Sequence, residues 1–255
     1  MIVGVFLKNI KIYKKTRFVP ITTRHRLTAF VGPNGAGKSS ILEALDTYFN
    51  NADWIVNKVA RRKGETTNFI NLPYVAPVMV ILKEEFEEAL VASQVTLNKS
   101  AVEAASDFFW NASRTSLPSF PDGDRFLAHR DTMREEHDPE LYYLVVAGVR
   151  FSTERNRPYF GPFHQQSSFH TSLGLQPPSG GSTQLEQSKA MDLQLADHVG
   201  NLNSVIHTLY DYIYIPSDVS IASYTRLETS NMQLLMGRDI NEEIRKAIPQ
   251  DRKSV

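Results

Sequence analysis

The chain has 255 residues, 42% of them hydrophobic and 22% charged, a balance typical of a soluble globular protein with one full core. It contains no cysteine, which excludes disulfides, thiolate catalysis and zinc sites built on cysteine. No apolar run approaches the roughly 20 residues that span a bilayer, so we expect a cytoplasmic protein with no membrane contact.

The formal net charge of zero hides an uneven distribution along the chain. Every charged residue before Glu43 is basic, and the remainder of the chain is correspondingly acidic. Such a segment predicts a positive face that could meet the phosphates of a nucleotide or of DNA. The alternative is that these side chains are solvated and protect a strand edge. The basic residues are Lys8, Lys11, Lys14, Lys15, Arg17, Arg24, Arg26 and Lys38.

The first third of the chain predicts strands followed by a helix. Residues 2–7 and 10–13 have an extended pattern, and residues 18–22 are their expected hairpin partner. The apolar residues 27–31 predict a short buried strand that enters a glycine-rich loop. Helical spacing of apolar side chains over 41–49 predicts a helix behind that loop.

The middle of the chain predicts another strand and two helices. Residues 75–82 form an apolar run, in which Pro77 predicts a position near the sheet edge or at the start of the strand. Residues 83–97 and 101–112 have helical spacing, with the glutamates of the first segment on its solvent face.

The rest of the chain alternates between strand, loop and helix predictions. Residues 141–151 predict a strand, which 157–160 could join. Residues 161–182 are rich in Gly, Pro, Ser and Gln without any period, which predicts a long loop. We expect a helix over about 183–209, a strand over 210–215 and a final helix over about 230–248.

Residues 32–40 carry the clearest motif, because they fit the phosphate-binding pattern G-x-x-x-x-G-K-[ST]. A strand, a glycine loop and a helix N-terminus place backbone N–H groups and a positive dipole end around one anion. Lys38 would reach the β- and γ-phosphates, and the Ser39 hydroxyl would complete a Mg²⁺ shell, which predicts ATP and Mg²⁺ as ligands. The expected nucleotide-binding residues are Gly32, Pro33, Asn34, Gly35, Ala36, Gly37, Lys38, Ser39 and Ser40, with Lys38 also acting in catalysis.

This motif, followed by Ile-Leu-Glu-Ala-Leu, is similar to the ABC-class ATPase heads of the SMC, RecF and OLD group. The opening segment Leu7-Lys8-Asn9-Ile10-Lys11 shares the basic strand with which those heads begin, so the resemblance covers about the first 50 residues. It implies an α/β P-loop NTPase, an ABC-ATPase-like N-terminal lobe with a mixed sheet and a helical insertion. It also implies that Lys11 contacts nucleotide phosphate, at a place where arginine is more usual.

The chain departs from that family in its acidic motif. The family needs an apolar strand that ends in Asp-Glu, whereas the run Val78–Leu82 leads into Lys83-Glu84. Residues 179–181, Ser-Gly-Gly, imitate the family's signature loop, but the prolines before them favour a plain loop.

The resemblance suggests two candidates for a metal contact besides Ser39. Gln165 or its neighbour Gln166 could be the glutamine that senses γ-phosphate, and Asp218 follows the apolar run 213–215. We therefore predict one ATPase lobe over 1–255, with a P-loop and β core at 1–160, a loop at 161–182 and a helical part at 183–255. The helical part would begin a longer helical or coiled-coil insertion, with the acidic motif beyond it.

The function expected from this resemblance is that of an ATPase head that dimerises on ATP. Hydrolysis would need C-terminal elements, and the head would act on DNA or on an effector partner such as a nuclease, in anti-phage defence or DNA repair. One alternative is a small metabolite or nucleotide kinase, with Arg150, Arg155 and Arg157 as its lid. Another is a scaffold that senses ATP without hydrolysing it.

Overall fold

The computed structural model describes residues 1–24, 27–57, 72–151, 153–176 and 183–215. The chain divides into two compact units, Met1–Tyr212 and Ile213–Val255, and all the described helices and strands belong to the first.

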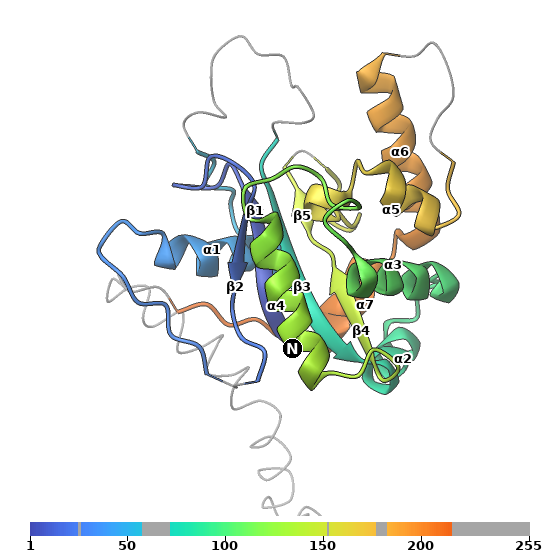
Figure 1. Cartoon of the computed structure of the whole chain (residues 1–255), viewed down its shortest axis with the longest axis horizontal. Helices are drawn as coiled ribbons and strands as arrows, with labels where there is room; N and C mark the ends of the chain where they lie inside the picture. Colours follow the sequence, from blue (N-terminus) through green and yellow to red (C-terminus); the bar gives the residue numbers. More distant parts are fainter. Residues whose placement is uncertain (25–26, 58–71, 152, 177–182, 216–255) are drawn as a thin grey trace, which may run out of the picture. The chain divides into compact units, whose positions relative to one another are not determined.

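A sheet with the strand order β2-β1-β3-β4 forms the centre of the first unit, and β5 pairs with β3 beyond the end of β4 (Figure 1). Every pair of strands in it is antiparallel. The strands are β1 (Ile2–Lys8), β2 (Arg17–Pro20), β3 (Tyr74–Leu82), β4 (Tyr142–Val146) and β5 (Val149–Arg150).

The predicted N-terminal hairpin is confirmed. Phe6 of β1 lies opposite Phe18 of β2, and both side chains are fully buried. Residues 10–13 are not a strand; Ile10 instead makes single bridges to Tyr13 and Val56.

The predicted position of Pro77 at an edge or at a strand start is wrong, because β3 lies between β1 and β4. Its carbonyl accepts from the Ala147 N–H at 3.2 Å, so its ring nitrogen also faces the β4 side. On that side, the hydrogen bonds of β3 to β4 end before those to β5 begin. Pro77 lies opposite this interruption, so its lack of an N–H leaves no strand acceptor without a donor. Gly148 passes so close that a Cβ would lie 1.9 Å from the Val75 carbonyl oxygen.

Side chains occupy both outer edges of this sheet. On β2 the Phe18 N–H donates to the Asp122 carboxylate at 3.0 Å. On β4 the Leu144 N–H donates to the Ser106 hydroxyl at 3.0 Å, and the Trp110 indole N–H donates to the Tyr142 carbonyl at 3.1 Å.

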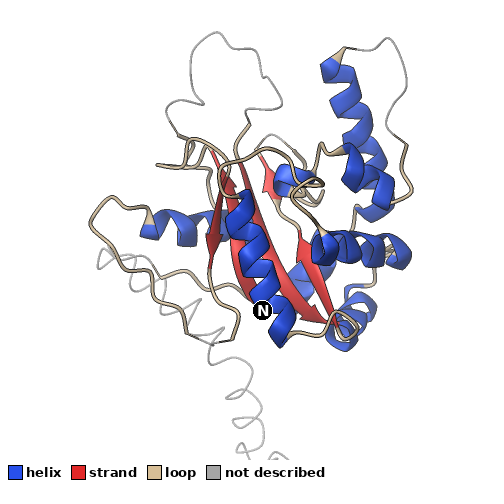
Figure 2. Ribbon diagram, viewed as in Figure 1, coloured by secondary structure: helices blue, strands red, loops and turns tan. Residues whose placement is uncertain are grey.

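Helices cover both faces of the sheet: α4 crosses in front of it, and α1 runs behind β2 (Figure 2). The predicted helices at 41–49, 83–97 and 101–112 are confirmed, and the second of them is shorter, because Gln94 adopts a left-handed conformation that ends it. The helices are α1 (Lys38–Phe49), α2 (Lys83–Ser93), α3 (Lys99–Asn111), α4 (Gly123–Glu136), η3 (Gly161–Phe163, a 3₁₀ helix), α5 (Ser167–Ser172), α6 (Gln184–Val199) and α7 (Leu202–Leu209).

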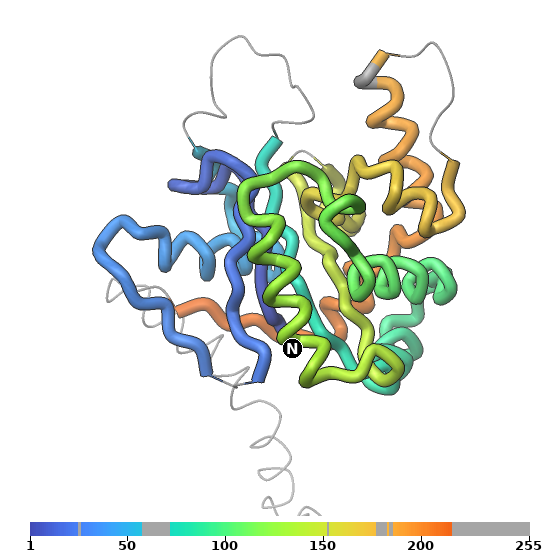
Figure 3. The backbone as a smooth tube through the Cα atoms, viewed as in Figure 1, coloured from blue at the N-terminus to red at the C-terminus, as the bar shows by residue number. Residues whose placement is uncertain are grey.

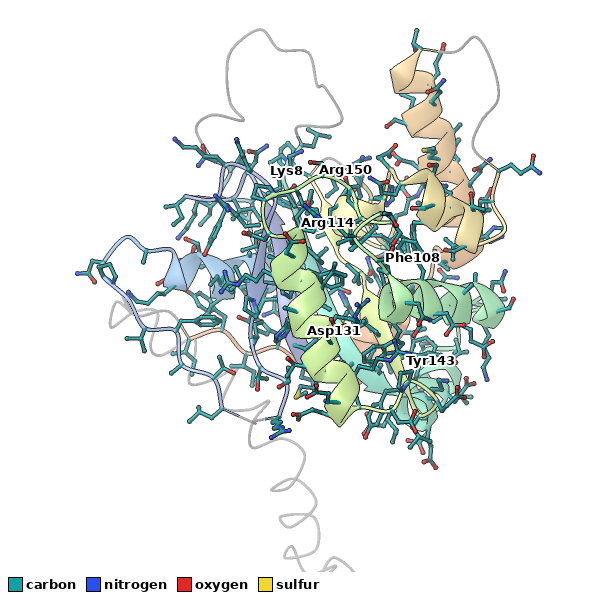
Figure 4. All side chains as sticks on the ribbon, in the orientation of Figure 1. Lys8, Phe108, Arg114, Asp131, Tyr143 and Arg150 are labelled. Atoms are coloured by element: carbon teal, nitrogen blue, oxygen red, sulfur yellow. The ribbon has the colours of Figure 1, made fainter. Side chains whose placement is uncertain are left out.

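Phenylalanine side chains from β1, β2, α3, α4, η3, α5 and the segments just before α4 and η3 form the core on one face of the sheet. The rings lie 5.0–6.0 Å apart, at the separations that aromatic pairs prefer. These residues are Phe6, Phe18, Phe108, Phe109, Phe120, Phe126, Phe160, Phe163 and Phe169, of which Phe108 is labelled in Figure 4.

The C-terminal predictions need correction. The segment 161–182 is not one long loop, because Phe163 and Phe169 are buried in the aromatic core and fold into η3 and α5. The helix predicted over 183–209 is two helices, α6 and α7, separated at 200–201. Residues 210–215 are not in a strand, and the helix expected over 230–248 lies outside the described residues.

Candidate nucleotide-binding site

The glycine-rich loop leads directly into α1, as the motif predicts. Gly35 and Gly37 have positive φ values of 81° and 92°, which other residues rarely adopt. Gly37 is the N-cap of α1, no side chain caps this helix end, and its first turn contains no acidic residue. The first N–H groups of α1 therefore remain able to bind an anion.

Lys38 reaches back over this loop. Its ammonium group donates to the carbonyls of Gly32 at 2.7 Å and Pro33 at 2.9 Å. Among the described residues no carboxylate forms an ion pair with Lys38, so its charge is available to a ligand. Gly37 and Ser40 are buried and Lys38 is half-buried, whereas the exposed members of the motif are Gly32, Pro33, Asn34, Gly35, Ala36 and Ser39.

The connection between β1 and β2 packs against the same loop. The Ile12 side chain lies so close to Gly37 that a Cβ there would approach it to 2.5 Å. The Tyr13 hydroxyl donates weakly to the Gly37 carbonyl at 3.5 Å. Lys11 forms an ion pair with Glu43 of α1. A phosphate contact by Lys11 stays a prediction, and in this structure its charge is directed toward Glu43.

A cleft of about 530 Å³ opens beside Lys38, between the P-loop, β2 and the first turn of α4. Asp122, just before α4, fixes one wall of the cleft by accepting from Arg17 at 3.3 Å as well as from the β2 backbone. Tyr13 and Arg125 line the cleft too. Asp122 and Arg125 were not predicted as site residues, because no helix was expected between residues 112 and 183, where α4 lies.

The predicted buried strand at 27–31 is wrong for the described structure. These residues belong to no strand, and the exposed fractions of Leu27 and Val31 are 85% and 93%. Phe30 is the one large side chain of the segment that packs against the core. The apolar pattern is present, but none of the described strands pairs with it.

Gln165 lies in a different polar cluster, close to α6. Its amide donates to Asp192 at 3.1 Å and its carbonyl oxygen accepts from Ser188 at 2.9 Å. No hydrogen bond among the described residues joins Gln165 to the P-loop. Asp218 and the Ser-Gly-Gly segment at 179–181 lie outside the described residues, so their roles stay predictions.

Asp192 is the centre of that second cluster. Its carboxylate accepts from Arg150 at 2.8 Å and from the His164 Nε2–H at 2.8 Å. The other ring nitrogen of His164, Nδ1, accepts from the Phe160 N–H, which places the proton on Nε2. Burial lowers the pKa of His164, and the hydrogen bond to Asp192 opposes this effect. Burial would raise the pKa of Asp192, but His164 and Arg150 together outweigh it and lower that pKa.

The arginines expected to form a kinase lid are engaged outside the P-loop cleft. Arg150 is 3% exposed and its guanidinium stacks over the ring of Tyr159. Arg155 donates to the Asn51 carbonyl, and Arg157 pairs with its neighbour Glu154. Figure 4 shows Arg150 among the side chains at one end of the sheet.

Comparison with known proteins supports the class that the motif and the fold indicate. Residues 1–117 match the family described as AAA ATPase domain, a match that ends after α3. With the glycine loop and α1 in place, the chain is an α/β P-loop NTPase. The match supports an ATPase domain in general and is broader than the SMC, RecF and OLD group. Neither the curated proteins nor the solved structures gave a match.

The described residues contain neither a membrane-spanning helix nor a cluster of metal-ligating side chains. No described helix is long and apolar enough to cross a bilayer. Nor do three His, Asp or Glu side chains gather anywhere in the described ranges to hold a metal ion. Ser39 stays the candidate Mg²⁺ contact within the motif.

Proposed function

We propose that this chain is an ATP-binding lobe whose P-loop holds the triphosphate of a nucleotide. The observation that carries the proposal is the geometry at Gly35, Gly37 and Lys38: two left-handed glycines, an uncapped helix N-terminus and a lysine without a carboxylate partner in the described structure. The family match over residues 1–117 supports the same activity.

Mg²⁺ fits this site through Ser39. Ser39 is the second residue of α1 and is exposed, so its hydroxyl is accessible to a metal–nucleotide complex. When bound, the ion would neutralise part of the phosphate charge. The chain's own contribution is to hold the phosphates with the loop N–H groups and with Lys38.

We further propose that hydrolysis requires elements other than those described. Among the described strands none leads into an Asp-Glu pair, and β3 leads directly into Lys83 and Glu84 of α2. A chain that binds ATP without turning it over is the second candidate, and the same missing acidic pair favours it.

ATP-dependent dimerisation and action on DNA or on a nuclease effector remain proposals that rest on the resemblance to SMC, RecF and OLD heads. The support from the structure is electrostatic. Lys14 and Lys15 are exposed in the connection between β1 and β2 and form no ion pair among the described residues. By contrast, Lys11, Arg17 and Arg24 are each paired with an acidic side chain.

Equilibrium binding of Mg·ATP to the Lys38→Ala variant tests the proposed site. We expect binding to weaken by about tenfold or more, because a charge-assisted contact to phosphate is lost. Lys99→Ala is the matched control, since Lys99 is exposed on α3 and pairs with Glu87 outside the cleft. Equal ATP affinity of the Lys38→Ala and Lys99→Ala proteins would refute the P-loop assignment. Phosphate release separates the two candidates when it is measured with the C-terminal elements that hydrolysis is expected to need, because the scaffold predicts binding without turnover even then and even when a dimer forms.

A further inference from the structure

The cleft beside the P-loop contains a second cationic group that no motif assigns, the guanidinium of Arg125. Three basic side chains line the cleft, Lys38, Arg17 and Arg125, against a single carboxylate, that of Asp122. Asp122 is already occupied, since one oxygen accepts from Arg17 and the other from the β2 backbone. Among the described residues no carboxylate forms an ion pair with Arg125. The cleft therefore has a surplus of positive charge, which suits an anionic ligand.

The backbone of Arg125 is held firmly, although its side chain is exposed. The next residue, Phe126, is fully buried and lies 5.3 Å from the rings of both Phe6 and Phe18. Asp122, three residues earlier, ties the start of α4 to β2. Figure 3 shows the preceding segment arching from α3 across to α4. These contacts fix the first turn of α4 beside the cleft.

Tyr13 lies against the P-loop and lines the same cleft as Arg125. Its hydroxyl lies 3.5 Å from the carbonyl of Gly37, the N-cap of α1. Burial raises the pKa of Tyr13, and the positive charge of Arg125 opposes this rise, which places the two groups within electrostatic reach of each other. Tyr13, Arg125 and Lys38 thus lie around the same cleft, although their positions along the chain are far apart.

We propose that Arg125 is a second cationic contact for the phosphate chain of the nucleotide, supplied by α4 in addition to Lys38 of the P-loop. This inference rests on the proposed function. A guanidinium presents several N–H donors in a rigid plane and binds phosphate oxygens in pairs, which an ammonium group does not do. Through this contact α4 would be coupled to the presence of the phosphates.

The test compares four variants, two at Arg125 and one each at Arg114 and Lys38, with two ligands, Mg·ATP and inorganic tripolyphosphate with Mg²⁺. The Arg125→Ala substitution is expected to weaken the binding of both ligands by about tenfold or more, because a charge-assisted hydrogen bond is lost. Arg125→Lys should restore part of that loss. Arg114→Ala is the control, because Arg114 lies beside the same helix turn, pairs with Asp124 and does not line the cleft (Figure 4). The affinities of the Arg114→Ala protein for both ligands should stay within about twofold of those of the unaltered chain, since removing an exposed charge has a small effect.

Each outcome decides between distinct possibilities. A loss for ATP but not for tripolyphosphate would place Arg125 at the base or ribose and overturn the proposal. Unchanged affinity for both ligands in Arg125→Ala, with binding lost in Lys38→Ala, would also overturn it but leave the proposed function intact. If Lys38→Ala binds both ligands normally, the proposed function itself fails.

Discussion

The Asp192 cluster allows the free energy of one buried ion pair to be predicted from its contacts. We expect Asp192→Ala to destabilise the protein strongly, because the carboxylate accepts from Arg150, His164 and Gln165 together. Arg150 is only 3% exposed and would keep its charge after its acidic partner is removed.

The magnitude follows from the burial of the two partners. Removing one member of a buried ion pair typically costs about 3–5 kcal/mol, because the other charge is left uncompensated. The Asp192 side chain is 22% exposed, so water would offset part of this cost. We therefore expect a loss of about 3 kcal/mol in the free energy of unfolding, at the low end of that range.

Urea unfolding of the purified chain measures this loss, and the neighbouring pair provides the control. Glu154 and Arg157 line the same small cavity as Asp192, but their side chains are 74% and 45% exposed. Glu154→Ala should therefore cost less than about 1 kcal/mol. If the Asp192→Ala and Glu154→Ala proteins lose similar free energies, the argument from burial is wrong.

Two further predictions concern protons and DNA. Burial lowers the pKa of four histidines, so below about pH 6.5 the unfolded chain gains protons that the folded chain does not. The unfolding free energy should then fall as the pH falls, by at most about 1.4 kcal/mol per pH unit for each histidine; urea unfolding between pH 7.5 and 5.5 checks this, and a flat profile would contradict it. For DNA, reversing the charges of Lys14, Lys15 and Arg17 should flatten the dependence of log affinity on log salt. A titration with duplex DNA that gives equal slopes with and without the reversals would exclude this face as a DNA surface. The four histidines of the pH prediction are His129, His164, His170 and His207.

The parts of the fold that could be predicted from the sequence are those with a strong local pattern. The β1–β2 hairpin, the helix behind the P-loop and β3 each have an apolar period that their own residues reveal. Helix α4 has no such period, since one of its inward side chains is an arginine. Arg130 is 8% exposed and donates to the carbonyl of Ala112 at 2.6 Å, a contact that becomes visible only after the chain has folded.

The failure at residues 27–31 has the opposite cause. The local pattern predicts a strand, but a strand requires a neighbour, and the edge of β2 is bonded to Asp122 instead. The P-loop itself was predictable, because its glycines and Lys38 are contiguous. The remainder of the cleft could not be predicted, because Asp122 lies 104 residues along the chain from Phe18, the β2 residue whose N–H it binds.

The side chains at the two edges of the sheet have a consequence for the solubility of the protein. An unpaired strand edge can recruit strands from other molecules through its free backbone N–H groups. Here Asp122 accepts from one such N–H group of β2, and Ser106 accepts from one of β4. Asp122 also shapes the cleft beside Lys38. Protection of the β2 edge and the shape of the cleft beside Lys38 therefore depend on the same carboxylate, so this position cannot change for one purpose without affecting the other.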